Sequence, residues 1–110
     1  MVAPFDIEDK MKLGILVNSN QHLDDIIGIV KAASLKGHTV TIFVTDVGTQ
    51  LLARSEFTLL SELERVSITF CEHSAEHNHI QLEGVPESIS KGSQYNNAVM
   101  NKESDRVIVL

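Results

Sequence analysis

Residues 12–44 decide the fold, and they read KLGILVNSNQHLDDIIGIVKAASLKGHTVTIFV. Residues 12–17 form a short apolar run that ends at polar residues, which is typical of a strand buried on both faces. Apolar residues then recur at helical spacing over about residues 22–36, and Gly37 supplies a left-handed stop. Residues 39–44 are dense in β-branched side chains, which favours a strand. This order predicts a right-handed, parallel βαβ unit.

The rest of the chain continues this alternation of strands and helices. We expect one broken helix or two short ones over residues 51–63, a strand over 66–70 and a helical turn over 75–79. A short strand over 85–90, interrupted by Pro86, should follow. The chain should then form a helix that is capped by Ser93 and carries Tyr95 and Met100, and a final strand over 106–110. The sequence therefore predicts a single α/β domain over residues 1–110, with residues 1–11 as an N-terminal extension. Its sheet is mostly parallel, with helices on both faces.

Composition limits the partners and the compartment. The chain has 110 residues, 43% of them hydrophobic, which is enough for a core. Nine basic and fifteen acidic residues give a net charge of −6, which disfavours nucleic acid as a partner because phosphate binding relies on Lys and Arg. No apolar run has the length of a membrane span or the pattern of a signal peptide. With one free cysteine, these features predict a cytoplasmic protein.

Three loops follow predicted strands and are candidates for a binding site. They are residues 18–20, 45–48 and 71–73. In open parallel sheets, ligands bind outside the carboxyl ends of the strands. The third loop begins with Cys71, the one strongly nucleophilic side chain among these loops. Cys71 is therefore the candidate catalytic residue.

The residues after Cys71 bear on its reactivity. Ser74 and Ala75 begin the predicted helical turn, and their backbone N–H groups would stabilise a thiolate and lower the thiol pKa. A protonated His73 would act in the same direction, whereas Glu72 would oppose it. The alternative is that Cys71 is a small, inert, buried side chain.

A metal site is a second interpretation of the same segment. Cys71, His73, His77 and His79 fall within nine residues, and His73 and His77 have the spacing of a helical metal pair. Thiolate and imidazole ligands suit zinc or copper. A second spaced cluster, which zinc sites usually have, is missing, so the histidines are also consistent with a solvated polar loop.

Several segments together resemble the DsrE-like sulfur-relay family. They are residues 37–43 (GHTVTIF), 46–48 (DVG) with Leu51-Leu52, 66–71 (VSITFC) followed by Ser74-Ala75, and 104–109 (SDRVIV). The resemblance covers about residues 12–110. It implies a three-layer α/β/α domain with a five-stranded parallel sheet that assembles into trimers or hexamers.

The resemblance also implies a function. In sulfur-relay members, a cysteine at the position of Cys71 accepts sulfur as a persulfide and passes it on, without a cofactor. The partners would be a protein sulfur donor and a protein acceptor. Two features depart from the pattern: residues 77–79 (HNH) stand where members often have an arginine or small residue and a glycine, and some members lack the cysteine. A non-catalytic oligomeric subunit that docks a partner is therefore a further alternative.

Three other residues receive structural roles. Gly28, inside the first predicted helix, is expected to allow close approach of that helix to the sheet. Asp46 is expected to form a turn, and Tyr95 to be a core or interface residue.

Overall fold

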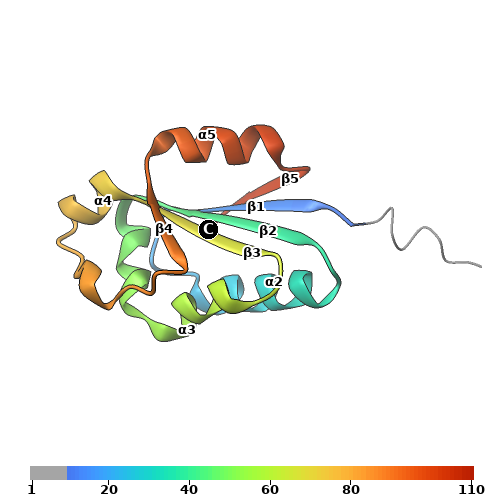
Figure 1. Ribbon diagram of the computed structural model, residues 1–110, viewed down its shortest axis with the longest axis horizontal. Helices are drawn as coiled ribbons and strands as arrows, with labels where there is room; N and C mark the ends of the chain where they lie inside the picture. The colour runs from blue at the N-terminus through green and yellow to red at the C-terminus, as the bar shows by residue number, and fades with distance from the viewer. Residues whose placement is uncertain (1–9) are drawn as a thin grey trace, which may run out of the picture.

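Five parallel strands form the middle layer of the protein (Figure 1). The computed structural model describes residues 10–110. Its strands are β1 (Lys12–Val17), β2 (Thr39–Val44), β3 (Val66–Cys71), β4 (Ile89–Gly92) and β5 (Arg106–Val109). They lie in the order β4-β3-β2-β1-β5, and each neighbouring pair is parallel. The predicted α/β class and parallel sheet are confirmed.

Helices cover both faces of this sheet. The α-helices are α2 (Leu23–Leu35), α3 (Ser55–Thr58), α4 (Glu72–His77) and α5 (Gln94–Glu103), and the 3₁₀ helices are η1 (Asp46–Ala53), η2 (Leu59–Glu62) and η3 (Leu82–Gly84). Figure 1 shows α5 on one face, α2 and α3 on the other, and α4 at the end of the sheet where β3 stops. The three-layer α/β/α arrangement is thus confirmed. Residues 1–9 of the predicted N-terminal extension lie outside the described residues.

The alternation of side chains along the strands divides the core into two parts. Ile15, Ile42 and Ile68 belong to the larger cluster, which packs against α2 and α3. Phe43 and Cys71 point to the other face, where they pack with Met100 of α5. Side chains two residues apart share a face of a strand, so Thr69 and Cys71 both face the α5 layer. This register places the thiol beneath the start of α5.

The end of α2 shows the predicted left-handed stop. Gly37 has φ of 88°, its N–H donates to the Ser34 carbonyl at 3.0 Å, and the N–H of His38 donates to the Ala33 carbonyl at 3.0 Å. These two bonds form a Schellman motif, which satisfies the last carbonyl groups of the helix. The chain can then turn directly into β2.

The predicted strand over residues 85–90 is largely wrong, because β4 occupies Ile89–Gly92. The Val85 N–H donates to the Leu82 carbonyl, and the Ile89 N–H donates to the Pro86 carbonyl, both at 3.0 Å. These local turns use the backbone groups that a strand would pair with a neighbour. The helical turn predicted over 75–79 also starts earlier, at Glu72.

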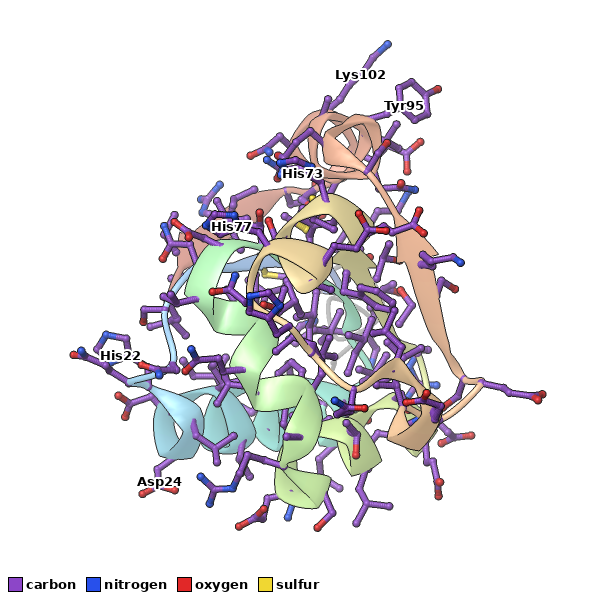
Figure 2. The ribbon with its side chains drawn as sticks, turned by 90° about the vertical axis from the view of Figure 1, so that its left-hand side faces the viewer. His22, Asp24, His73, His77, Tyr95 and Lys102 are labelled. Atoms are coloured by element: carbon purple, nitrogen blue, oxygen red, sulfur yellow. The ribbon has the colours of Figure 1, made fainter. Side chains whose placement is uncertain are left out.

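The structure bears on the roles expected of three single residues. Gly28 is exposed, and a Cβ built on it would meet nothing within 4 Å, so it permits no close approach. Tyr95 is 74% exposed and projects from α5 away from the sheet (Figure 2), so the core position is wrong, while the interface position stays a prediction. Asp46 occupies a left-handed turn with φ of 53°, as its turn-forming role requires.

No helix between Lys10 and Leu110 has the length and apolar character needed to cross a lipid bilayer.

Candidate functional site

Cys71 lies at the junction of a strand and a helix. It is the last residue of β3, pairs with Gly92 of β4, and directly precedes α4. Its side chain is only 4% exposed and packs beside Phe43 and Met100. The thiol therefore sits between the apolar layer under α5 and the polar start of α4.

A hollow of about 520 Å³ opens over Cys71. Two strand-to-helix junctions line it, β3 to α4 and β4 to α5, because β3 and β4 are neighbours in the sheet. The lining residues are Cys71, Glu72, His73, Ser74, Gly92, Ser93, Gln94 and Tyr95. A reactant would reach the sulfur through this hollow, since the rest of the Cys71 side chain is packed in the core.

Hydrogen-bond donors around the sulfur outweigh the effect of burial. Burial raises the pKa of Cys71, but the Ser74 hydroxyl, the Ser74 N–H, the Gln94 amide and the His73 N–H together hold this pKa below its usual value. Cys71 occupies the N-cap position of α4, although the thiol makes no cap hydrogen bond of standard geometry. N–H groups at this position are free of intrahelical partners and favour a negative charge. The site thus favours a thiolate.

The three predicted supporting residues have different positions. Ser74 lines the hollow and stabilises the thiolate through both its hydroxyl and its N–H. His73 contributes through its backbone N–H, while the residue as a whole is exposed. Ala75 is fully buried in the larger core, where its small side chain lets α4 pack onto the sheet end.

Thr45 and Gln94 also belong to this site. Thr45 lies in the predicted loop over residues 45–48 but was not singled out within it, and Gln94 was not predicted. The Oγ atoms of Thr45 and Ser74 are 3.1 Å apart, and Gln94 Nε2 donates to Thr45 Oγ1 at 3.0 Å. Thr45 follows β2, and Gln94 is the first residue of α5. The predicted helix cap at Ser93 could have pointed to Gln94, because a helix that begins directly after a strand starts at the carboxyl end of that strand, where sites form.

Of the three predicted loops, two reach the site. Thr45 of the second loop contacts Ser74 beside Cys71 of the third. The first loop lies elsewhere: Asn20 donates to Gln50 at 2.6 Å, and the Ser19 hydroxyl donates to the Leu110 carbonyl at 2.7 Å.

Further contacts fix α4 against its neighbours. Asn78 Nδ2 donates to the Asp46 carbonyl at 3.1 Å and to the Ser74 carbonyl at 2.9 Å. On the other side, Lys91 of β4 pairs with the Glu72 carboxylate at 3.5 Å. Exposed pairs of this kind contribute about 0–1 kcal/mol. Lys91 therefore gives the Glu72 carboxylate a cationic partner. The negative charge of Glu72 was expected from the sequence to oppose ionisation of Cys71.

The histidines of the metal interpretation do not gather around Cys71. His73 and His77 lie on α4, where Figure 2 shows both at its surface, and His79 lies beyond the end of this helix. Within residues 10–110, no three His, Cys, Asp or Glu side chains come close enough to share a metal ion. The observed geometry therefore does not favour a zinc or copper site made of Cys71, His73, His77 and His79.

A second hollow, of about 290 Å³, lies between α5 and the sheet. Threonines of β2 and β3 line it, together with Lys12, Glu103 and Ser104, but no cysteine or histidine does. It therefore offers no strong nucleophile.

No model of a protein family matches this sequence, and no curated protein matches it significantly. Among solved structures, the chain is similar to the ychN protein from E. coli, with a TM-score of 0.68. The alignment covers 92% of this chain and 99% of that chain, at 11% sequence identity. That protein has a DsrE-like fold. At this level of identity the comparison concerns architecture alone, and it shows that the chain has a DsrE-like fold.

Proposed function

We propose that this protein is a sulfur carrier of the DsrE-like kind, which accepts sulfane sulfur on Cys71 as a persulfide and passes it to an acceptor thiol. One observation carries the proposal: the lone thiol lines a hollow at the carboxyl ends of the strands, where surrounding donors lower its pKa. The DsrE-like fold supports the same interpretation.

The loading step needs only a thiolate and an accessible donor. The Cys71 thiolate attacks the terminal sulfur of a donor persulfide, R–S–SH. A new S–S bond forms at Cys71 while the S–S bond of the donor breaks, and the donor leaves as the thiolate R–S⁻. The transferred sulfur keeps its proton and its oxidation level, so no external oxidant or reductant is consumed.

The unloading step reverses the role of Cys71. An acceptor thiolate attacks the terminal sulfur of Cys71–S–SH, and Cys71 leaves as a thiolate. A lowered pKa makes Cys71 a better leaving group in this step, and in the loading step it raises the fraction present as a nucleophile. The same donors around the sulfur therefore assist both halves of the cycle.

The burial of Cys71 restricts its partners. Because the side chain is 4% exposed, a donor must extend its persulfide into the hollow. A cysteine on a protruding segment of a partner protein fits this requirement, so we propose a protein donor and a protein acceptor. We also propose a cytoplasmic location, where thiols stay reduced, and a homo-oligomer, a trimer or hexamer. Apolar side chains exposed in the monomer, among them Leu35 at 90% and Val109 at 56%, support oligomer formation.

Intact-protein mass spectrometry after incubation with glutathione persulfide tests the proposal. The wild-type chain should gain one or more sulfur atoms, and dithiothreitol should remove them, while Cys71→Ser should gain none. Iodoacetamide labelling of the native protein provides the control for access. If the thiol is labelled but takes up no sulfur, the proposal is wrong. If it resists both reagents, Cys71 is inert and the docking-subunit alternative gains support.

A further inference from the structure

Thr45 connects the two side chains that flank the sulfur. Its hydroxyl oxygen lies 3.1 Å from the Ser74 hydroxyl and accepts a hydrogen bond from Gln94 at 3.0 Å. Ser74 belongs to α4, Gln94 to α5, and Thr45 follows β2. One hydroxyl thus joins the ends of three elements around Cys71.

The number of available protons fixes the direction of these bonds. A thiolate can only accept, so a hydrogen bond between the Ser74 hydroxyl and an ionised Cys71 uses the Ser74 proton. The contact between Thr45 and Ser74 must then use the Thr45 proton, and Thr45 accepts from Gln94 at the same time. Such a bond to the sulfur would complete a one-way chain, in which Gln94 donates to Thr45, Thr45 to Ser74, and Ser74 to the thiolate. Chains of this kind polarise their members and strengthen the final bond.

A row of amides along α5 orients Gln94. Asn101 Nδ2 donates to Asn97 Oδ1 at 2.9 Å, and Asn97 Nδ2 donates to Gln94 Oε1 at 3.2 Å. Because the Gln94 oxygen accepts from Asn97, its NH₂ group faces Thr45 and the hollow. That group has two protons, of which one is donated to Thr45, and Gln94 lines the same hollow as Cys71.

We propose that Thr45 is a positioning residue for Cys71: its hydroxyl holds the side chains of Ser74 and Gln94 in place where both line the hollow beside the sulfur. This inference deepens the proposed function and rests on it for its biological purpose. Thr45 is uncharged, and the titratable groups around the hollow are Glu72 and His73 on α4, Lys91 on β4 and Tyr95 on α5. A substitution at Thr45 leaves all of these charges in place.

The test is the pH profile of Cys71 alkylation by iodoacetamide, which needs no persulfide. Thr45→Val keeps the shape and removes the hydroxyl, and it should move the midpoint of the profile upward, toward that of the urea-unfolded chain. Thr45→Ser restores the hydroxyl and should keep the wild-type midpoint. Thr41→Val makes the same change on the same face of β2, beside the second hollow, and should have no effect.

Two further variants make the result independent of any single substitution. Gln94→Met removes the amide at an exposed position and should also raise the midpoint. In a Ser74→Ala background, Thr45→Val should shift the midpoint less than it does alone, because Thr45 acts partly through Ser74. An unchanged midpoint in folded Thr45→Val, or an equal shift in Thr41→Val, overturns the proposal. Sulfur loading is measured separately, so a shifted midpoint without loading would contradict the proposed function and leave the role of Thr45 standing.

Discussion

Cys71 stands where helices usually place a serine or an aspartate. As the residue before α4, it faces N–H groups that have no partner within the helix. A thiol here gains from becoming a thiolate, because the charged form accepts these hydrogen bonds more strongly than the neutral form. The position therefore favours the thiolate form of this buried cysteine and lowers its pKa.

The first prediction concerns the pH dependence of this thiol. Because the pKa of Cys71 is lowered in the folded chain, the folded thiol ionises at a pH where the unfolded thiol remains protonated. The rate of iodoacetamide labelling should reach its midpoint at lower pH in buffer than in urea, where the reference value is about 8.5. Ser74→Ala should raise the folded midpoint.

Ser67→Ala provides the matched control on β3, since Ser67 is exposed and lies away from the hollow. The midpoint reports the pKa, whereas the plateau of the labelling rate reports access to the buried sulfur. Equal midpoints in buffer and in urea would show that the donors around Cys71 do not stabilise its thiolate.

At the level of elements, the short helix α4 depends on how it ends. His79 has φ of 57°, its N–H donates to the Glu76 carbonyl at 3.1 Å, and the Ile80 N–H donates to the Ala75 carbonyl at 3.0 Å. This Schellman motif places a histidine at a position where glycine is the usual residue. The geometry gives His79 a role in ending the helix that does not involve a metal.

We predict that His79→Gly stabilises the protein. Glycine adopts the left-handed conformation without strain, which should raise the free energy of unfolding by roughly 0.5–1 kcal/mol after its larger entropy loss is included. His77→Gly lies inside α4, and there the same substitution should cost roughly 0.5 kcal/mol. Urea unfolding with and without zinc measures both effects. Stabilisation of the wild type by zinc that disappears in His79→Gly would revive the metal interpretation.

On the scale of the whole molecule, a backbone hydrogen bond connects the end of β1 to Thr45 of the candidate site. The Val17 carbonyl at the end of β1 accepts from the Thr45 N–H at 2.9 Å. A Cβ on Gly48 would collide with this carbonyl oxygen. Close packing of η1 on β1 therefore requires glycine at position 48, and a displacement there would reach Thr45.

Two glycine substitutions should thus have opposite effects on global stability. Gly48→Ala should lower the free energy of unfolding by about 1–3 kcal/mol, because backbone must shift to admit the methyl group. Gly28→Ala lies on an exposed part of α2 with free space around it and should raise stability by roughly 0.5–1 kcal/mol. Urea unfolding curves with equal slopes would measure the difference. Equal stabilities would mean that η1 is not packed on β1 as described.

The sequence predicted the parts of the fold whose signal is local. In β1, α2 and β2, the spacing of apolar residues in the sequence matches the spacing of buried residues in the structure, and Gly37 indicates where α2 ends. The edge strand β4 lacks such a signal, because only Ile89 of its four residues is buried. The predicted strand therefore began at Val85, four residues before β4 begins at Ile89.

The candidate site was predictable only where its residues are close together in the sequence. Cys71 and Ser74 are three residues apart, so their relation follows from a strand followed by a helix. Thr45 and Gln94 are ordinary polar residues far away in the sequence. Thr45 contacts Ser74, and Gln94 contacts Thr45, only because β2, β3 and β4 are neighbours, and this strand order was not evident from the sequence.

The most direct test of the account is a complete transfer cycle on one sample. Wild-type protein is loaded with glutathione persulfide, freed of the donor, and mixed with N-acetylcysteine, and both products are followed by mass spectrometry. We predict that the protein loses its added sulfur while the acceptor gains it as a persulfide, and that Ser74→Ala slows this release. Sulfur that stays on the protein, or that loads equally onto Cys71→Ser, would contradict the claim that Cys71 is a sulfur carrier.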